Sequence, residues 1–318
     1  MKIRILSDVH YDPGINGNGK FDEKYSGQFQ KADINLLAGD IAVLPERTTD
    51  FLEKFIGESL CYIIGGNHIE YRSDYRTHRE IIKEYQKTFP LNHAFYRFLE
   101  NDYQFIPGTD NSVAVIGSIF YTDYKLCTYD VDAYNNRQTA WDLMMNSYGL
   151  HTTPSKPIKK LTKKLILKEN LLSASSGMND FAWGHITKTR HLSPEDYLKF
   201  HKIAKRKVLE CYKKIIGINP KAKVILLTHH CLSANCISEK YKKSFINSSF
   251  ASDLENWIDT KMPRVRLVVS GHVHERFDFT FGKNNIRYIC NPVGYIPHKE
   301  DEKEPAFNPN LIVDTDEL

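Results

Sequence analysis

The amino-acid sequence predicts an α/β sandwich, because short apolar runs alternate with helical stretches and each run ends in a polar cluster. Runs of four or five mainly aliphatic residues, bounded by glycine or polar residues, are typical of buried strands. They lie at residues 2–6, 34–38, 61–64, 224–227 and 265–269. Helices are predicted between some of them, at residues 45–58 and 193–216, each with a proline close to its start. Strands that alternate with helices favour sheets covered by helices.

The middle of the chain differs from its two ends. Residues 121–219 lack clear strands and are rich in helix-forming, aromatic and charged residues, so we predict a mostly helical insertion, or cap, within a single domain of residues 1–318. Inside this insertion, residues 157–168 space apolar side chains among lysines, as in an amphipathic helix. Residues 277–290 predict a hairpin around Gly-Lys-Asn-Asn, and irregular structure is expected after Gly294.

The composition excludes several classes of protein. The 318 residues are 41% hydrophobic, 26% charged and 12% aromatic, which fits a globular chain with a core and excludes a mostly disordered one. No stretch approaches the ~18 apolar residues that a membrane span needs. The net charge of +4 is too small to indicate nucleic-acid binding by itself.

The cysteines and the first residues favour the cytoplasm. Six widely spaced cysteines in a chain of this length are expected to be reduced thiols rather than a disulfide framework. The first ten residues carry a charge inside their only apolar run, which is unlike a secretory signal. We therefore expect a cytoplasmic protein that has no membrane partner.

Polar side chains follow five of the predicted strands directly. In chain order the clusters are Asp8-x-His10, Gly39-Asp40, Gly66-Asn67-His68, Thr228-His229-His230 and Gly271-His272-x-His274. Because loops at the carboxyl ends of strands converge on one crevice in open α/β sheets, we expect these side chains to meet. The i, i+2 spacing within the first and last clusters predicts two side chains on the same side of an extended segment.

In this order, the clusters resemble the signature of the calcineurin-like metallophosphoesterase family, in which DxH, GD, GNH, a later His and GHxH follow one another. The matching parts are residues 1–120 and 221–295. The resemblance implies a four-layer αββα sandwich with an insertion and a site for two divalent metal ions. Carboxylate oxygen and imidazole nitrogen together suit Mn, Fe, Zn, Ni or Co, of which we favour Mn.

The resemblance also implies a role for each residue of the clusters. Asp40 would bridge the two metals, because a carboxylate has two oxygens to share. The other ligands would form two groups of three: Asp8, His10 and His274 for one metal, and Asn67, His229 and His272 for the other. His68 would be the catalytic residue, stabilising the transition state or protonating the leaving group, as suits a side chain with a pKa near ~6.5.

Two positions depart from the family pattern or are ambiguous within it. The family often continues GNH directly with an acidic residue, whereas here Ile69 stands before Glu70. Glu70 is therefore only a candidate for supporting the site. We favour His229 over its neighbour His230 as the metal ligand, which leaves His230 as a candidate for contacting the substrate or a ligand.

Segments outside the main clusters resemble a bacterial and phage subgroup of the same family. Residues 178–181 and 192–195 look like part of its insertion, in which Asp180 would either face the site or cap a helix. Residues 291–295 resemble its NPxGY segment, in which Tyr295 is a further candidate neighbour of the site. The lysines of residues 156–168 are either a solvated helix face or an attraction for a polyanion.

These observations predict a phosphoesterase in which hydroxide, activated by the two metals, hydrolyses a phosphomonoester or a phosphodiester. A small phosphorylated molecule is the expected substrate. A nuclease with the same site is an alternative, which the weak net charge disfavours. A non-catalytic protein-binding scaffold is a more distant alternative, because a scaffold would be free to lose ligands and here the set is complete.

Overall fold

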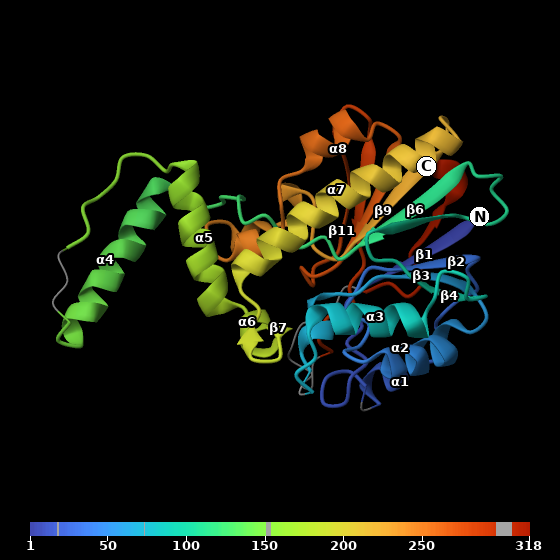
Figure 1. Cartoon of the computed structure of the whole chain (residues 1–318), viewed down its shortest axis with the longest axis horizontal. Helices are drawn as coiled ribbons and strands as arrows, with labels where there is room; N and C mark the ends of the chain where they lie inside the picture. The colour runs from blue at the N-terminus through green and yellow to red at the C-terminus, as the bar shows by residue number, and fades with distance from the viewer. Residues whose placement is uncertain (18, 73, 151–153, 297–306) are drawn as a thin grey trace.

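The computed structural model describes residues 1–17, 19–72, 74–150, 154–296 and 307–318, which form a mixed α/β sandwich built on two sheets (Figure 1). The first sheet has five strands, in the order β13-β1-β2-β3-β4. Their bounds are Ile312–Asp314, Lys2–Leu6, Ile34–Leu37, Leu60–Ile63 and Tyr96–Phe98. Strands β1 to β4 run parallel, and β13 pairs antiparallel to β1 at the edge.

The second sheet has six strands, in the order β11-β12-β10-β9-β6-β5. Their bounds are Phe277–Phe281, Ile286–Cys290, Val265–Ser270, Lys223–Thr228, Val113–Ser118 and Asp102–Phe105. The four central strands are parallel, while β11 and β5 pair antiparallel at the two edges. A separate two-stranded ribbon joins β7 (His185–Thr187) to β8 (Arg190–His191).

Helices lie on the outer faces of both sheets and in an arm beside them (Figure 1). The α-helices α1 to α8 span Lys20–Tyr25, Pro45–Phe51, His78–Thr88, Val131–Ser147, Lys163–Gly177, Asp180–Trp183, Pro194–Ile218 and Glu255–Lys261. The helix α2 continues as one π-helical turn over Leu52–Ile56. Short 3-10 turns occupy Asn67–Glu70, Ala234–Cys236, Glu239–Tyr241, Asn247–Ser249 and Thr315–Glu317.

Three large hydrophobic clusters hold these layers together. One lies between the two sheets and includes Ile5 and Leu36 from the first sheet and Leu227 and Val269 from the second. A second cluster joins the other face of the first sheet to α1, α2 and α3, and a third joins the other face of the second sheet to α7 and α8. Alternate residues of each strand therefore pack on opposite sides, as the pleat of a buried strand requires.

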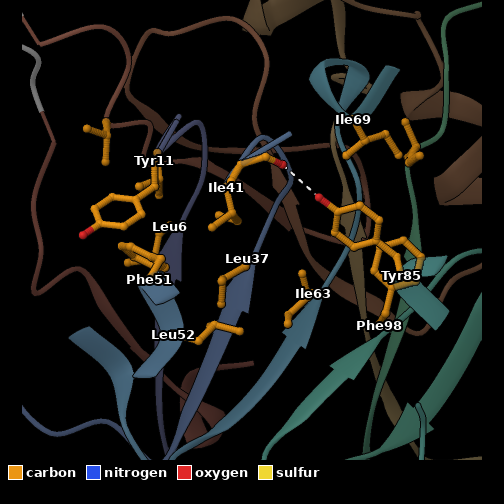
Figure 2. Packing of buried hydrophobic residues seen from close by; sticks show 14 of the residues in the cluster. Leu6, Tyr11, Leu37, Ile41, Phe51, Leu52, Ile63, Ile69, Tyr85 and Phe98 are labelled. Atoms are coloured by element: carbon orange, nitrogen blue, oxygen red, sulfur yellow. Dashed lines mark hydrogen bonds between the residues drawn. The ribbon is translucent and has the colours of Figure 1, made fainter. Parts of the chain in front are cut away.

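Figure 2 shows the cluster on the outer face of the first sheet. Leu6, Leu37 and Ile63 are register partners on β1, β2 and β3, so their side chains form one row across the sheet. Phe51 and Leu52 of the second helix pack over this row. The row lies just before the loops that carry three of the polar clusters, so its packing fixes where these loops leave the sheet.

The predicted insertion contributes to two different regions. Helix α7 packs on β5 and β6, whereas α4 and α5 form an arm that extends away from the sheets (Figure 1). A capping box at Ser193 and Asp196, followed by Pro194, starts α7 where the sequence predicts. The basic segment behaves differently, because α5 begins only at Lys163, with Thr162 as its cap, and residues 157–162 are not helical.

The sequence did not predict several of the strands. Strands β4 and β5 are short and carry polar residues, and β6 was not distinguished from the loops around it. Irregular structure was expected after Gly294, yet β13 forms there by pairing with β1. Part of that tail, residues 297–306, lies outside the described residues.

The structure bears on the expectations about the cysteines and about a membrane-spanning segment. The six cysteines are free thiols, and five of them are buried. Among the described residues, no helix combines the length and the apolar character that crossing a membrane requires. The cytoplasmic location stays a prediction.

We expect Leu37→Ala to lower the free energy of unfolding by about 2–5 kcal/mol, because Leu37 is fully buried in the row under α2. Urea denaturation followed by circular dichroism measures the change. Leu172→Ala, at a half-exposed position on α5, is the matched control and should change stability by less than about 0.5 kcal/mol. Equal effects of the two substitutions would contradict the packing described here.

Candidate metal centre

The five polar clusters lie in the loops that follow β1, β2 and β3 of the first sheet and β9 and β10 of the second. Hydrogen bonds tie these loops to one another across the two sheets. The backbone N–H of His10 donates to the carbonyl of Asp40 at 2.9 Å, and the backbone N–H of His272 donates to Asp8 Oδ1 at 2.9 Å. Segments that are about 260 residues apart in the chain therefore meet at one edge, as the strand order predicts.

Five residues of the clusters have a left-handed backbone, which is uncommon for residues other than glycine. Their φ angles lie between 49° and 69°: Asp8, His10, Asp40, His272 and His274. The expectation of extended i, i+2 segments is therefore wrong, since the strands end earlier and the loops turn at each of these positions. Each such residue costs about 1–3 kcal/mol and persists only where the surrounding bonds hold it, which is common at functional sites.

Two glycines make room for the side chains of the site. A Cβ on Gly66 would lie 1.9 Å from Asp40 Oδ1, so only glycine lets this carboxylate approach the loop after β3. Gly39 has a φ of +87°, and a Cβ there would lie 2.4 Å from His229 Nδ1. Glycine is required at both positions by close approach, and at Gly39 by the backbone angle as well.

Asp8, His10 and His274 form the first group of potential ligands. The Nε2 atoms of His10 and His274 are 3.0 Å apart, and His274 Nε2 lies 3.5 Å from Asp8 Oδ1. Two atoms that bind one ion at ~2.1 Å must lie roughly 3–4 Å from each other. The spacing of this group fits a single shared cation.

Asp40, His229 and His272 form the second group, and Asn67 adjoins it. His229 Nε2 lies 3.3 Å from Asp40 Oδ2 and 2.9 Å from Asn67 Oδ1. The other ring nitrogen, His229 Nδ1, donates to the carbonyl of Ala38 at 2.8 Å. This bond leaves Nε2 free to act as a ligand, which is the usual arrangement of a metal-binding histidine.

His68 belongs to a third group, with His10 and Asp40, which connects the other two. Its backbone N–H donates to Asp40 Oδ1 at 3.0 Å, and its Nε2 lies 3.9 Å from Asp40 Oδ2. The ring stacks on Tyr71 at 4.2 Å between centroids and lies 4.5 Å from the ring of His10. The side chain is mostly buried but reaches the cavity of the site.

The electrostatics of the site favour a positive charge beside Asp40. Burial opposes ionisation of Asp40, yet His229 and His68 hold the pKa of this carboxyl well below its usual range. Burial likewise opposes protonation of His229, but Asp40 outweighs it and raises the pKa of His229 to about 9, so a cation that binds Nε2 would take the place of this proton. Burial and the neighbouring His68 lower the pKa of His10 to about 3, so this ring is neutral and its lone pair is available.

Unpartnered buried atoms support the same interpretation. Asp8 Oδ2 and His272 Nε2 are buried and have no hydrogen-bond partner among the described residues. A buried carboxylate oxygen or imidazole nitrogen without a partner is costly, and a bound cation removes that cost. The carboxylate, imidazole and amide donors brought together here therefore fit divalent transition metals.

Glu70 and His230 lie beside the site without joining its donor groups. Glu70 Oε1 pairs with His78 Nδ1 and accepts from the hydroxyl of Tyr121 at 3.4 Å. Glu70 therefore holds the helix α3 to the site and does not orient His68. His230 lies within hydrogen-bond distance of the carbonyl of Ile119 through Nδ1, and its ring packs 4.3 Å from that of His272.

Asp180 of the predicted insertion reaches the site through Tyr71, a residue that belongs to none of the motifs in the sequence. The Tyr71 hydroxyl donates to Asp180 Oδ2 at 3.1 Å and accepts from Asn67 Nδ2 at 3.4 Å. Tyr197 donates to Asp180 Oδ1 at 2.9 Å, so the fully buried carboxylate has a donor on each oxygen. The hydrogen bonds that run from Asp180 through Tyr71 orient the amide of Asn67 so that its oxygen faces His229.

The position of Tyr71 could have been suspected from its spacing. It stands three residues after His68, at the end of the 3-10 turn Asn67–Glu70, and side chains three residues apart eclipse in such a turn, so Tyr71 lies over His68. Tyr295 also lies at the site, with its ring 4.9 Å from that of His10 and 4.8 Å from that of His274. Asn291 has a structural role, because its amide donates to the carbonyl of Ile5 at 2.7 Å.

The site opens into a cavity of about 270 Å³, whose walls include Asp40, His68, His274, Asn179 and Tyr295. Its floor comes from the strand-end loops and one of its walls from the residues between α5 and α6. A cavity of this size admits a phosphoryl group with part of its substituents.

Comparisons with known proteins identify the fold. The structure is similar to the crystal structure of the phosphopantetheinyl hydrolase PptH from Mycobacterium tuberculosis, with a TM-score of 0.59 and 13% identical residues over 92% of this chain and 89% of that chain. At this identity the likeness concerns the fold alone. No family model matches the sequence, and a search of curated proteins finds no significant match.

We expect Tyr71→Phe to weaken Mn²⁺ binding by about tenfold, because the amide of Asn67 loses the oxygen that orients it. Isothermal titration of the metal-free protein measures the affinity. Tyr148→Phe, at an exposed position beyond α4, is the matched control and should leave the affinity unchanged. Affinities for Tyr71→Phe within twofold of the unsubstituted protein would show that Tyr71 does not position Asn67.

Proposed function

We propose that the protein is a metal-dependent phosphoester hydrolase of the calcineurin-like metallophosphoesterase type, with a four-layer helix–sheet–sheet–helix core. The observation that carries this proposal is the meeting of three interlinked donor groups at the ends of five strands. The similarity of fold to a phosphopantetheinyl hydrolase supports it. The three hydrophobic clusters that separate the layers are consistent with such a core.

In this proposal, two divalent cations occupy the site, and we favour Mn. Asp8, His10 and His274 would hold one, Asn67, His229 and His272 the other, with Asp40 shared between them. Bound cations of this kind lower the pKa of coordinated water toward ~7 and offset charge on phosphoryl oxygens. The protein itself holds the ligand atoms at fixed spacing, in buried loops whose backbone is left-handed at five of the cluster residues.

His68 is the proposed catalytic residue. Its backbone bond to Asp40 and the stacked ring of Tyr71 fix the imidazole at the wall of the cavity. From there it can donate a proton to the oxygen of a leaving group or a hydrogen bond to a phosphoryl oxygen. A positioned group of this type typically contributes 10²–10⁴-fold to the rate.

A small phosphorylated molecule is the proposed substrate. The cavity at the donors continues toward a larger one of about 670 Å³, which shares His68, Tyr71, Asn179 and Tyr295 with it and contains Lys20. The name of the structural neighbour, a phosphopantetheinyl hydrolase, fits a substrate of this class. These cavities are large enough for a metabolite and its phosphoryl group.

Removal of metal tests the proposal directly. Chelator-treated protein should hydrolyse bis-p-nitrophenyl phosphate at least ~10²-fold more slowly than protein reconstituted with Mn²⁺, because the donors alone do not activate water. His272→Ala should abolish the reconstitution, whereas His191→Ala, at an exposed position on β8, should not. Lack of metal-dependent turnover on this ester, on p-nitrophenyl phosphate and on nucleotides would count against a hydrolase.

Substitution of His68 separates catalysis from metal binding. We expect His68→Ala to lower kcat by about 10²–10⁴-fold. The variant should still bind Mn²⁺, because His68 lies beside the proposed metal ligands and is not itself one of them. Single-turnover kinetics and metal titration on the same sample measure both quantities.

The same protein samples distinguish the alternatives. Cleavage of single- or double-stranded nucleic acid faster than hydrolysis of small esters would favour a nuclease. Unchanged cellular function of the His68→Ala variant would favour a scaffold that does not use the reaction.

A further inference from the structure

A third cavity, of about 230 Å³, borders the cleft of the metal centre and shares no lining residue with the larger cavity that contains Lys20. It is formed by the loop between β9 and α8 and by the residues that follow β10. The side chains that matter below are Ile237, Ser238, Ile246, Phe250, Val273 and Glu275. None of them belongs to the donor groups described above.

This cavity adjoins the cleft of the metal centre. Phe250 and Val273 line both spaces. Val273 lies between His272 and His274 in the chain, and the ring of Phe250 packs 4.9 Å from the ring of His272. A substituent on a phosphoryl group held at the donors therefore has this cavity as one of its adjoining spaces.

The walls of the cavity are suited to an uncharged group. Ile237, Ile246, Phe250 and Val273 present apolar side chains, and Ser238 contributes a small one. Glu275 also lines the cavity, where its carboxylate disfavours an anionic ligand, and Lys240 at 3.4 Å offsets part of that charge. A site of this composition stabilises a ligand mainly through burial of apolar surface.

Another space beside the cleft has a different character. There the larger cavity of about 670 Å³ contains Asp12, Lys20 and the exposed indole of Trp183. A phosphoryl group at the donors thus has both an apolar and a polar space next to it, and the two spaces share different residues with the cleft. A monoester has a single organic substituent and would use only one of them, whereas a diester has one for each.

We propose that the cavity beside Phe250 and Val273 is a subsite for a compact apolar ester group, and that the substrate is a phosphodiester whose other substituent is polar. This inference rests on the proposed phosphoesterase function. The volume of the cavity limits the apolar group to about the size of a benzyl group or a short alkyl chain.

Competitive inhibition by phosphonates tests the subsite independently of which ester bond breaks. With Mn²⁺-loaded protein and bis-p-nitrophenyl phosphate as reporter, benzylphosphonate should inhibit at a concentration at least about tenfold lower than methylphosphonate. In Ser238→Phe, which fills the cavity from its edge, this preference should fall to within about twofold while inhibition by inorganic phosphate stays unchanged.

Two further variants make the result specific. Ser112→Phe, at an exposed position before β6 at the opposite end of the sheet, should keep the preference for benzylphosphonate. Ile246→Ala enlarges the cavity and should improve inhibition by naphthylmethylphosphonate relative to benzylphosphonate.

The outcomes separate this inference from the proposed function. Metal-dependent hydrolysis with equal inhibition by benzyl- and methylphosphonate, or a preference that survives in Ser238→Phe, would overturn the subsite and leave the hydrolase standing. A higher kcat/KM for p-nitrophenyl phosphate than for bis-p-nitrophenyl phosphate would overturn the diester. Absence of metal-dependent hydrolysis would overturn the function itself.

Discussion

The buried carboxylate of Asp40 is the group on which the arrangement of the site depends. It accepts the backbone N–H of His68, lies 3.3 Å from His229 Nε2 and is approached so closely by Gly66 that no side chain fits there. A carboxylate removed from water costs several kcal/mol unless hydrogen bonds and positive charge compensate it. The loops after β3 and β9 meet at Asp40, in the loop after β2, because each supplies part of that compensation.

The same constraint explains the unusual backbone of the site. Straight continuation of the strands would carry Asp8, Asp40 and His272 past one another, whereas left-handed turns direct them toward a common centre. The bond from His272 N–H to Asp8 and the bond from His10 N–H to the carbonyl of Asp40 stabilise these turns. Local strain in the loops is thus balanced by hydrogen bonds between them, which in turn rely on the rigid packing of the two sheets.

Segments other than the strand-end loops determine the surroundings of the site. Asp180, from the segment between α5 and α7, acts on Asn67 through Tyr71 and so links the insertion to the donors. The loop between β9 and α8 supplies Phe250, and the chain after β12 supplies Tyr295. The sheets therefore provide the chemistry common to the site, while these connections decide the shape of the space around it.

The sequence by itself determined which residues end the strands, since apolar runs, glycines and polar clusters are local patterns; it predicted β1, β2, β3, β9, β10 and the start of α7. It also favoured His229 over His230 as a ligand, and of these two His229 lies within a group of potential ligands. Only the tertiary structure decided that β13 pairs with β1, that Glu70 turns to His78, and that Tyr71 joins Asp180 to Asn67. Those outcomes depend on contacts between segments that are far apart in the sequence. Such contacts produce no periodic pattern along the chain from which they could be predicted.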